Sequence, residues 1–515
     1  MDKIKLLDCT LRDGGYYTKW DFSDDLVEIY LNACNALPID YIEVGYRSLP
    51  SSEYFGEFFY CPEYLLSKIR KTFKKKIAIM LNEKDVQIKD AEELLFDKNK
   101  YIDLVRLAVD PENFFRAIGL AKHIKQMGFE VGFNLMYMSK WAGQPELTKQ
   151  FHELNEAADY FYMVDSYGGI YPEEVAEICK IVKDRVEIPY GFHGHNNLEM
   201  ALINSLTAVE NGATLLDATI TGMGRGAGNL KTELLLAAMH AKGIMEIDFN
   251  VLGDLTHAFE ELQSIHKWGT NLPYMVSGAN SLPQKDVMEW VSKRFYSYNS
   301  IIRALHNQKA KREDNESFKV FSLPKGSNPT VLLVGGGPSV AERSNAISTF
   351  LLKNPKIIVV HASSRNAGNF KGVANEQYFC LVGNEGNRLE KVFEDLGHFK
   401  GTCLLPAFPR KMGTYVPPAV VDMTFELKSV DFTEKLQDTH TAIALQTLIE
   451  LSATKVYVVG YDGYANALIG NRELELFNEN EILFSKYIGH SGVELKTLTP
   501  SLYKTLNADS LYANI

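Results

Sequence analysis

Two histidines and one aspartate are the residues whose types and positions most clearly suggest catalysis. His193 and His195 stand two residues apart at the end of a predicted strand, so both imidazoles project toward the same side of the chain. Such a pair alone more often serves packing or hydrogen bonding. Asp13 lies at the end of another predicted strand, and two histidines with one carboxylate are a common site for a catalytic divalent metal. We therefore predict a metal site that these three residues share.

Arg12 would place a fixed cation beside that metal. It could stabilise a developing enolate oxygen or bind a carboxylate through two hydrogen bonds. It could equally form a salt bridge with Glu43 or Asp165, which lie at the ends of other predicted strands. These roles do not exclude one another.

A glycine-rich loop, Gly222–Gly228, invites comparison with phosphate-binding loops. It lacks the downstream acidic residue of a dinucleotide site, which argues against NAD. Asn229, which follows the loop, could offer its amide oxygen to the metal or cap the next helix, and the sequence leaves both open.

The first 245 residues alternate short β-branched runs with longer amphipathic stretches, the pattern of a parallel sheet with crossover helices. Eight such units in this length predict a (β/α)8 TIM barrel. The predicted strands are Ile4–Cys9, Tyr41–Gly45, Ile77–Leu81, Leu104–Val109, Val131–Met136, Tyr160–Val164, Tyr190–His193 and Leu215–Thr219. The predicted helices include Asp24–Asn35, Phe114–Met127, Pro172–Arg185, Leu198–Asn211 and Thr232–Ala241.

The polar candidates all fall at the carboxyl ends of predicted strands, where barrel active sites are built. An open doubly wound sheet would also bind ligands at that edge. The clustering therefore supports an α/β site, and the count of eight favours the closed barrel.

A chain of 515 residues is too long for one ordinary core, so at least two domains are expected. We assign residues 1–245 to the barrel, 246–310 to a helical appendage over or beside its mouth, and 311–327 to a linker. Residues 328–515 are expected to form a Rossmann-like α/β domain with a parallel sheet. Its predicted strands are Thr330–Val334, Ile357–His361, Tyr378–Val382, Gly401–Leu405 and Val456–Gly460.

The composition narrows the possible partners. The net charge is -11 and no dense basic stripe is present, so nucleic acid is not expected to bind. Six scattered cysteines without a C-x-x-C pair indicate a reducing compartment, and no apolar run is long enough for a membrane span. We expect a cytoplasmic protein that does not bind membranes.

Four segments together resemble the metal-dependent barrels that include 4-hydroxy-2-oxovalerate aldolase and hydroxymethylglutaryl-CoA lyase. The segments are Asp8–Gly15, Val164–Ser166, His193–Asn197 and Gly222–Asn229. The resemblance implies that Asp13, His193 and His195 bind Mn2+ or Mg2+, with Co2+ or Zn2+ also possible, and that Asn229 lies near the metal. It implies that a carbon–carbon bond is made or broken through a metal-bound enolate of a pyruvate-like 2-oxo acid.

The resemblance also assigns roles to residues around the metal. Arg12 would stabilise the enolate, and the 2-oxo acid pocket would include Asp165 and Ser166, with Glu43 and Tyr274 as further candidates. Related aldolases carry a histidine for proton transfer where this chain has Tyr16. Tyr16 could transfer the proton or form an aromatic wall, and Tyr17, Tyr274 or a water could act instead. Because Tyr16 replaces this histidine, the resemblance does not identify the aldehyde substrate.

Two other functions remain open from the sequence. The same barrel could be a Claisen-type acyl-CoA lyase or synthase, or it could be a scaffold for a C-terminal nucleotide- or glycan-binding domain. Through Leu332–Ser339 and Val456–Gly463, that domain faintly resembles Rossmann-like domains of bacterial surface-carbohydrate synthesis. This resemblance suggests a carbohydrate-derived aldehyde as one substrate of the barrel. The family resemblance further suggests a homodimer.

Overall fold

The computed structural model describes residues 4–292, 297–312, 316–322, 328–410, 413–464 and 471–515. Its internal contacts divide the chain into two units, Met1–Glu289 and Trp290–Ile515, which are described separately below. The division falls inside the segment 246–310 that the sequence analysis assigned to a helical appendage.

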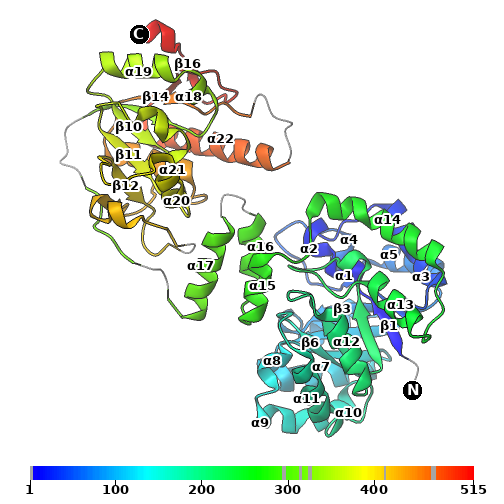
Figure 1. The fold of residues 1–515 in the computed structure, drawn as a ribbon. Coiled ribbons are helices and arrows are strands. Elements are labelled where there is room, and N and C mark those ends of the chain that lie inside the picture. Colours follow the sequence, from blue (N-terminus) through cyan, green and yellow to red (C-terminus); the bar gives the residue numbers. More distant parts are fainter. Residues whose placement is uncertain (1–3, 293–296, 313–315, 323–327, 411–412, 465–470) are drawn as a thin grey trace. The chain divides into compact units, whose positions relative to one another are not determined.

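The first unit is built on a closed barrel of eight parallel strands that follow one another in chain order (Figure 1). All eight predicted strands are confirmed, and each of their ends lies within one residue of the predicted one. The strands are β1 (Lys5–Asp8), β2 (Tyr41–Tyr46), β3 (Lys76–Asn82), β4 (Leu104–Val109), β5 (Glu130–Leu135), β6 (Tyr160–Asp165), β7 (Tyr190–Gly194) and β8 (Leu215–Ala218). The fold class is therefore the predicted TIM barrel.

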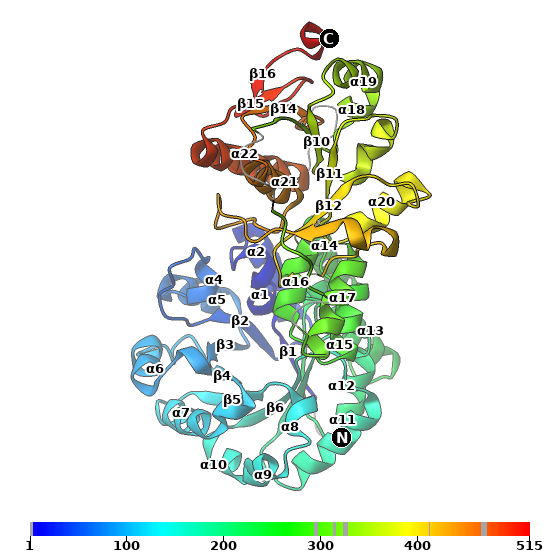
Figure 2. The same ribbon diagram turned by 90° about the vertical axis from the view of Figure 1, so that its left-hand side faces the viewer.

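Amphipathic helices surround the barrel because the strands are apolar toward their outer face as well as inside. Figure 2 shows these helices outside the strands. The longer ones are α3 (Asp24–Ala36), α5 (Glu63–Thr72), α6 (Ile88–Leu95), α7 (Phe114–Gln126), α11 (Pro172–Lys183), α12 (Ala201–Glu210) and α13 (Thr232–Ala241). Shorter helices in the βα loops are α1 (Thr10–Asp13), α2 (Gly15–Thr18), α4 (Glu57–Tyr60), α8 (Met138–Trp141), α9 (Pro145–Thr148) and α10 (Leu154–Ala157).

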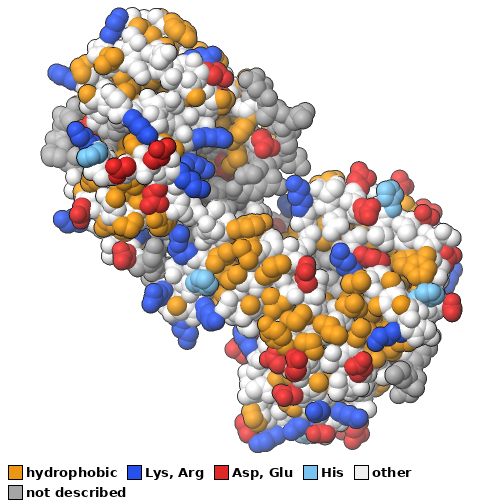
Figure 3. Space-filling model, viewed as in Figure 1, with side chains coloured by type: hydrophobic (Ala, Val, Ile, Leu, Met, Phe, Trp, Pro, Cys, Tyr) orange, Lys and Arg blue, Asp and Glu red, His pale blue; other side chains and the backbone are white. Residues whose placement is uncertain are grey.

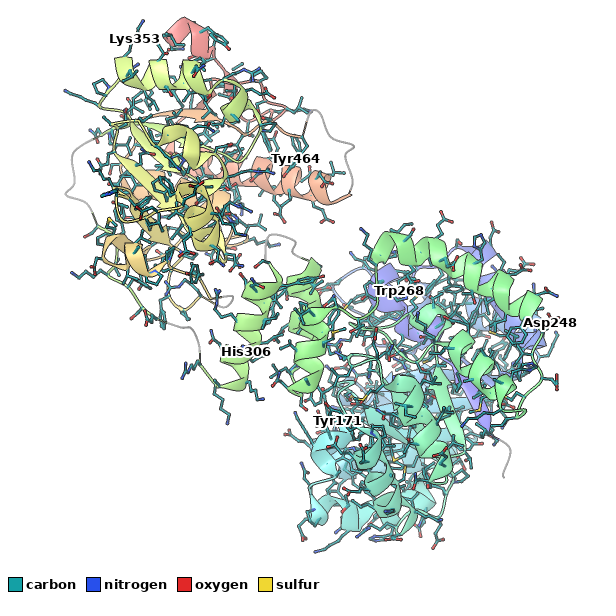
Figure 4. All side chains as sticks on the ribbon, in the orientation of Figure 1. Tyr171, Asp248, Trp268, His306, Lys353 and Tyr464 are labelled. Carbon is teal, nitrogen blue, oxygen red and sulfur yellow. The ribbon has the colours of Figure 1, made fainter. Side chains whose placement is uncertain are left out.

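Three helices follow the last barrel helix within the first unit: α14 (Phe249–His266), α15 (Leu272–Ala279) and α16 (Gln284–Ser292), the last of which crosses the division between units. Trp268, which lies between α14 and α15 (Figure 4), donates from Nε1 to the carbonyl of Thr221 at 3.1 Å. Asn197 Nδ2 donates to the carbonyl of Tyr274 at 2.9 Å. The segment thus packs on loops at the carboxyl ends of the strands, at the mouth of the barrel.

The second unit contains an eight-stranded parallel sheet in the order β13-β12-β11-β10-β9-β14-β15-β16. The predicted parallel sheet is confirmed, and β13, β15 and β16 are additional strands. The bounds are β9 (Thr330–Val334), β10 (Ile358–His361), β11 (Gln377–Cys380), β12 (Thr402–Leu405), β13 (Thr424–Glu426), β14 (Lys455–Val459), β15 (Leu495–Thr497) and β16 (Asn507–Ala508).

Helices cover both faces of this sheet, as in a doubly wound fold. Side chains of α21 and α22 pack on one face, and those of α19 pack on the other. The helices of this unit are α17 (Tyr298–Lys309), α18 (Ser339–Glu342), α19 (Ser344–Lys353), α20 (Glu385–Phe393), α21 (His440–Glu450) and α22 (Asn471–Ser491).

The surface carries both signs of charge, with acidic and basic side chains interspersed on the face seen in Figure 3. All six cysteines are buried and free. In the part of the chain that the structure describes, no helix has the length and apolar character required to cross a membrane.

Candidate active site at the barrel mouth

The turn after β1 brings Arg12 and Asp13 to the mouth of the barrel. Asp8, the last residue of the strand, accepts hydrogen bonds from the backbone N–H of Thr10 at 3.0 Å and from its hydroxyl at 2.6 Å. The Asp8 carboxylate also accepts from the hydroxyl of Thr232, at 2.6 Å, on α13. These bonds connect the start of α1 to α13, the last helix of the barrel, and so fix the turn that carries Arg12 and Asp13.

Three buried side chains at this mouth form a group that could hold a metal ion. One ligand atom each from Cys9, Asp13 and His193 lie within 4.8 Å of one another. His193 Nε2 is 3.7 Å from Asp13 Oδ2. Cys9 was not among the sequence candidates; burial raises the pKa of its thiol well above the ordinary value, which favours the neutral form over a thiolate ligand.

Both histidines contact a neighbouring oxygen through Nδ1, which leaves Nε2 on the other side of each ring. His193 Nδ1 contacts Asp217 Oδ2 at 2.8 Å, and His195 Nδ1 contacts the carbonyl of Asp165 at 2.7 Å. If each Nδ1 carries the proton, each Nε2 is left as a lone-pair donor, the usual arrangement in metal sites. The ring centroids are 5.0 Å apart, and burial lowers the pKa of His195 to about 4, so His195 is neutral at pH 7.

Asn229 joins this group from the glycine-rich loop. Its Nδ2 donates to Asp13 Oδ2 at 2.6 Å, while its Oδ1 is buried and has no hydrogen-bond partner among the described residues. Asn229 does not cap α13, whose N-cap residue is Lys231. A buried amide oxygen without a partner among the described residues, near a carboxylate and two imidazoles, fits a divalent cation that binds oxygen and nitrogen ligands.

Arg12 is buried and anchored on two carboxylates. Its Nε donates to Glu43 Oε2 at 2.7 Å, and its Nη1 contacts Asp13 Oδ1. Burial alone would raise the pKa of Asp13, but the Arg12 guanidinium lowers that pKa overall, so the carboxylate remains ionised. The salt bridge to Glu43 that the sequence left open is present.

Two charged residues in the barrel interior, Arg106 and Asp217, connect Glu43 to His193. Arg106, which has no exposed surface, contacts Glu43 Oε1 at 3.2 Å through Nη1 and Asp217 Oδ2 at 2.5 Å through Nη2. Asp217 in turn contacts His193. Although burial raises it, the pKa of Asp217 is lowered overall because of the Arg106 guanidinium.

Glu43 is also fully buried, so the structure places it beneath Arg12 and beside Arg106. We predicted it as a residue of the substrate pocket. In its observed position both of its carboxylate oxygens lie against arginines, Arg12 and Arg106.

Asp165 and Ser166 follow β6 and shape the mouth through hydrogen bonds to the backbone. Asp165 Oδ1 accepts from the N–H of Gly168 at 3.0 Å, and burial raises the pKa of this carboxyl to about 6. Ser166 Oγ accepts from the N–H of Tyr137 at 2.8 Å. The Asp165 carboxylate therefore organises its own loop, while its carbonyl orients His195.

Aromatic side chains stand beside the charged group. The hydroxyl of Tyr16 lies 3.4 Å from that of Tyr46, and the Arg225 guanidinium lies 5.4 Å from the centre of the Tyr16 ring. Tyr17 donates to the carbonyl of Gly226 at 3.0 Å, and burial raises the pKa of Tyr17 to about 12. Tyr274, on α15, is buried against the same glycine-rich loop.

The sequence analysis missed Arg106 and Asp217, although each carries a detectable signal. Each is a charged residue inside an otherwise apolar strand, in Leu104–Val109 and in Leu215–Ala218. Charged side chains are rarely buried without a partner, so two charged residues of opposite sign, in two different strands of one barrel, indicate an internal ion pair. Tyr46 and Arg225 gave no comparable signal.

Comparison with known proteins identifies relatives of the barrel. The HMGL-like family profile matches residues 100–262. A 4-hydroxy-2-oxovalerate aldolase of Moorella thermoacetica is 32% identical over 263 residues, which cover 50% of this chain and 77% of that protein. The enzyme of the same name from Pelotomaculum thermopropionicum is 34% identical over 245 residues, 47% of this chain and 71% of that protein.

A solved structure extends the comparison to three dimensions. The N-terminal domain of a candidate aldolase from Bacteroides vulgatus is 55% identical, with a TM-score of 0.56, and covers 58% of this chain and 100% of that one. An oxaloacetate decarboxylase of Mycobacterium tuberculosis is 26% identical over 305 residues, 58% of this chain and 89% of that protein. Through its barrel, the chain belongs to the HMGL-like aldolase and lyase family and is a carbon–carbon lyase.

Proposed function

We propose that the barrel is a divalent-metal-dependent aldolase that makes or breaks the carbon–carbon bond next to the carbonyl of a pyruvate-like 2-oxo acid. The observation that carries this proposal is the buried set at the barrel mouth, in which Asp13 lies beside His193, the ring of His195 lies 5.0 Å from that of His193, and the Asn229 oxygen has no partner among the described residues. Two imidazoles and a carboxylate with open positions are a common arrangement for catalytic divalent metals. The names of the aldolase relatives support the substrate class.

The proposed ligands are Asp13, His193 and His195, with Asn229 as a further oxygen donor. Mn2+ or Mg2+ fits this set best, and Co2+ or Zn2+ would also be accepted. When bound, such an ion supplies Lewis acidity that favours the enolate form of a chelating 2-oxo acid. Asp217 and the Asp165 carbonyl hold the two imidazoles in the orientation needed for binding.

Arg12 would stabilise the negative charge that develops on the enolate oxygen. Glu43 and Asp13 fix its guanidinium, so little reorganisation is needed when the charge appears. Ser166 and Tyr274 would line the pocket for the 2-oxo acid, and Arg225, over the ring of Tyr16, would add a cation for a substrate carboxylate.

Tyr16 would transfer the proton to or from the hydroxyl that becomes the aldehyde carbonyl. Its hydroxyl contacts that of Tyr46, whose pKa burial raises well above the ordinary value, so Tyr46 remains protonated and can hydrogen-bond to Tyr16. The proposed second substrate is an aldehyde, and carbohydrate-derived aldehydes belong to the class to be screened.

One relative favours a second reaction at the same site. The alignment with this chain covers 89% of the oxaloacetate decarboxylase. Decarboxylation of a 2-oxo diacid also passes through an enolate. The same side chains would serve it, and the two reactions differ in the product released: an aldehyde or carbon dioxide.

Exchange of the methyl protons of pyruvate in heavy water tests the proposal. Protein loaded with Mn2+, chelated protein and His195→Ala are incubated with pyruvate, and manganese is removed before NMR spectra are recorded. We expect exchange only in the loaded protein, because it requires both the metal and His195. His257→Ala, which removes a histidine whose side chain is 87% exposed on α14, is the matched control.

Equal exchange in loaded protein and in His195→Ala would contradict the assignment of the metal site. Absence of exchange with every metal, together with turnover of acyl-CoA substrates, would replace the pyruvate proposal by a Claisen-type reaction. Release of carbon dioxide from oxaloacetate without aldehyde formation from 4-hydroxy-2-oxo acids would select the decarboxylase.

A further inference from the structure

We propose that the second unit binds a nucleoside phosphate in a cavity at the carboxyl ends of β9 and β14. The cavity has a volume of about 810 Å³ and lies entirely within this unit. Its size suits a ligand of several ring systems, and a bare phosphate would occupy only a small part of it. The inference is independent of the chemistry proposed for the barrel.

The cavity lies where the strand order of the sheet changes direction. From β9 the chain adds β10 to β13 on one side, and then crosses to place β14 on the other side. In open α/β sheets the loops diverge at this switch point and leave a crevice in which ligands bind. The loops after β9, β10 and β14 all line the cavity.

The loop after β9 allows close approach of a ligand at one glycine. A Cβ atom on Gly335 would lie 2.4 Å from the carbonyl oxygen of Gly460, and one on Gly337 would lie 2.6 Å from the same oxygen. These two glycines are needed for packing of the loop against the end of β14. A Cβ on Gly336 would meet nothing closer than 3.8 Å, so its missing side chain leaves room on the cavity side.

Two arginines lie next to Gly336. Arg365 Nη1 approaches the carbonyl of Gly336 at 3.4 Å, and Arg388 Nη1 approaches Ser363 Oγ at 3.3 Å. Among the described residues, no carboxylate forms an ion pair with Arg365, so its charge is available to a ligand. On the face of this unit seen in Figure 3, Lys and Arg side chains lie among Asp and Glu side chains. Guanidinium groups beside an open glycine are well suited to a phosphate group.

Two of the acidic residues of the cavity wall are used to hold the loops. Asp462 accepts hydrogen bonds from both the N–H and the hydroxyl of Ser339, and Glu385 accepts from the N–H of Ser364 at 2.8 Å. Glu385 also pairs with Arg388 and with His440. Arg388 therefore offsets the negative charge of Glu385, and the Asp462 carboxylate is engaged by two hydrogen bonds from Ser339, which lowers the repulsion that a phosphate would meet.

The opposite wall is largely aromatic and polar, and it also includes Glu479. The rings of Tyr461 and Tyr503 are 6.2 Å apart, and the hydroxyl of Tyr503 accepts from Asn480 Nδ2 at 2.9 Å. Tyr464, labelled in Figure 4, also lines this side. Such a wall can receive a base through stacking and hydrogen bonds, whereas the Gly336 side receives the phosphate. A nucleoside phosphate is the ligand class that matches both walls.

The test measures binding of CMP, UMP, AMP, GMP and their diphosphates to the full chain by isothermal titration calorimetry. Inorganic phosphate, pyrophosphate and the four nucleosides are titrated in parallel. We expect at least one nucleotide to bind more tightly than its nucleoside and than phosphate. Gly336→Val, which fills space that the protein leaves open, and Arg365→Ala should each weaken binding by about tenfold or more.

Matched controls separate this effect from damage to the fold. Gly372→Val adds the same side chain at an exposed glycine with nothing within 4 Å, and Arg312→Ala removes an exposed arginine that does not line the cavity. Both should bind the nucleotide as the wild type does, and so should His195→Ala. Gly336→Val should retain the metal-dependent exchange of the barrel.

Lack of binding of every nucleotide by the wild type would overturn the proposal, as would nucleotide binding unchanged in both Gly336→Val and Arg365→Ala. Phosphate or pyrophosphate binding as tightly as any nucleotide would overturn the nucleoside part. Failure of the pyruvate exchange experiment would leave these results unaffected, because the two sites lie in separate units.

Discussion

At the scale of single residues, the site includes charged groups that are not among the proposed metal ligands. Asp217 and Arg106 lie inside the barrel and join His193 to Glu43, which in turn holds Arg12. A buried charge is stable only with its partners in place, so each member of this series fixes the next. The ligands and Arg12 are therefore positioned by residues from β2, β4 and β8.

Replacement of Asp217 by Asn should weaken metal binding by about 10- to 100-fold, because the amide no longer holds His193 with its Nε2 lone pair free. The dissociation constant of Mn2+ is measured on metal-stripped protein, with Asp25→Asn, an exposed site on α3, as the control. An unchanged affinity in a folded Asp217→Asn protein would show that Asp217 does not orient the ligand.

Tyr16→Phe should lower the rate of carbon–carbon bond cleavage by about 10²- to 10⁴-fold, the usual contribution of a general acid or base, and leave Mn2+ affinity unchanged. Tyr512→Phe, whose side chain is two-thirds exposed, is the control. A rate within about threefold of the wild type would instead make Tyr16 an aromatic wall of the pocket, and would turn attention to Tyr46.

At the scale of elements, α15 lies in close contact with the loops that carry the site. A Cβ on Gly278 would lie 2.7 Å from Asn197 Cβ and 2.9 Å from the carbonyl oxygen of Tyr167. Asn197 follows the metal-site histidines, and Tyr167 follows Asp165 and Ser166. The position of this helix is thus coupled to the positions of catalytic loops through direct contact.

Gly278→Ala should destabilise the barrel by about 1–3 kcal/mol through overpacking, despite the higher helix propensity of alanine. Gly253→Ala, on exposed α14 where nothing lies within 4 Å, should stabilise it by up to about 1 kcal/mol. Urea unfolding, followed by tryptophan fluorescence, gives both values. If Gly278→Ala instead raised the free energy of unfolding, α15 would be able to move away from Asn197 and Tyr167 without loss of stability.

At the scale of the whole molecule, the two units should respond separately to acid. His361, at the end of β10, is buried, stacks on Phe379 at 4.4 Å and contacts Gln377 Oε1 through Nε2 at 2.9 Å. Burial lowers its pKa to about 4. The unfolded chain therefore takes up a proton below about pH 6.5, whereas the folded unit does so only near pH 4.

From these values, the second unit should lose about 2 kcal/mol of stability between pH 7 and pH 5 because of His361. His361→Phe should remove this pH dependence even if it changes stability at pH 7. Hydrogen exchange of peptides from β9 and β10, corrected for intrinsic rates, measures the effect in the wild type and in the variant. An equal loss in wild type and variant would exclude His361 as the cause.

The sequence by itself determined the barrel, the second parallel sheet and the nomination of Asp13, His193, His195 and Asn229. These predictions follow from local periodicity and from polar residues at strand ends, and both patterns can be read in short stretches of sequence. The tertiary structure alone decided which polar groups meet. Glu43 and the Asp165 carboxylate serve as supports, whereas Cys9, Arg106, Asp217 and Tyr46 stand beside the site, because such contacts join residues of different strands whose pairing no local pattern encodes.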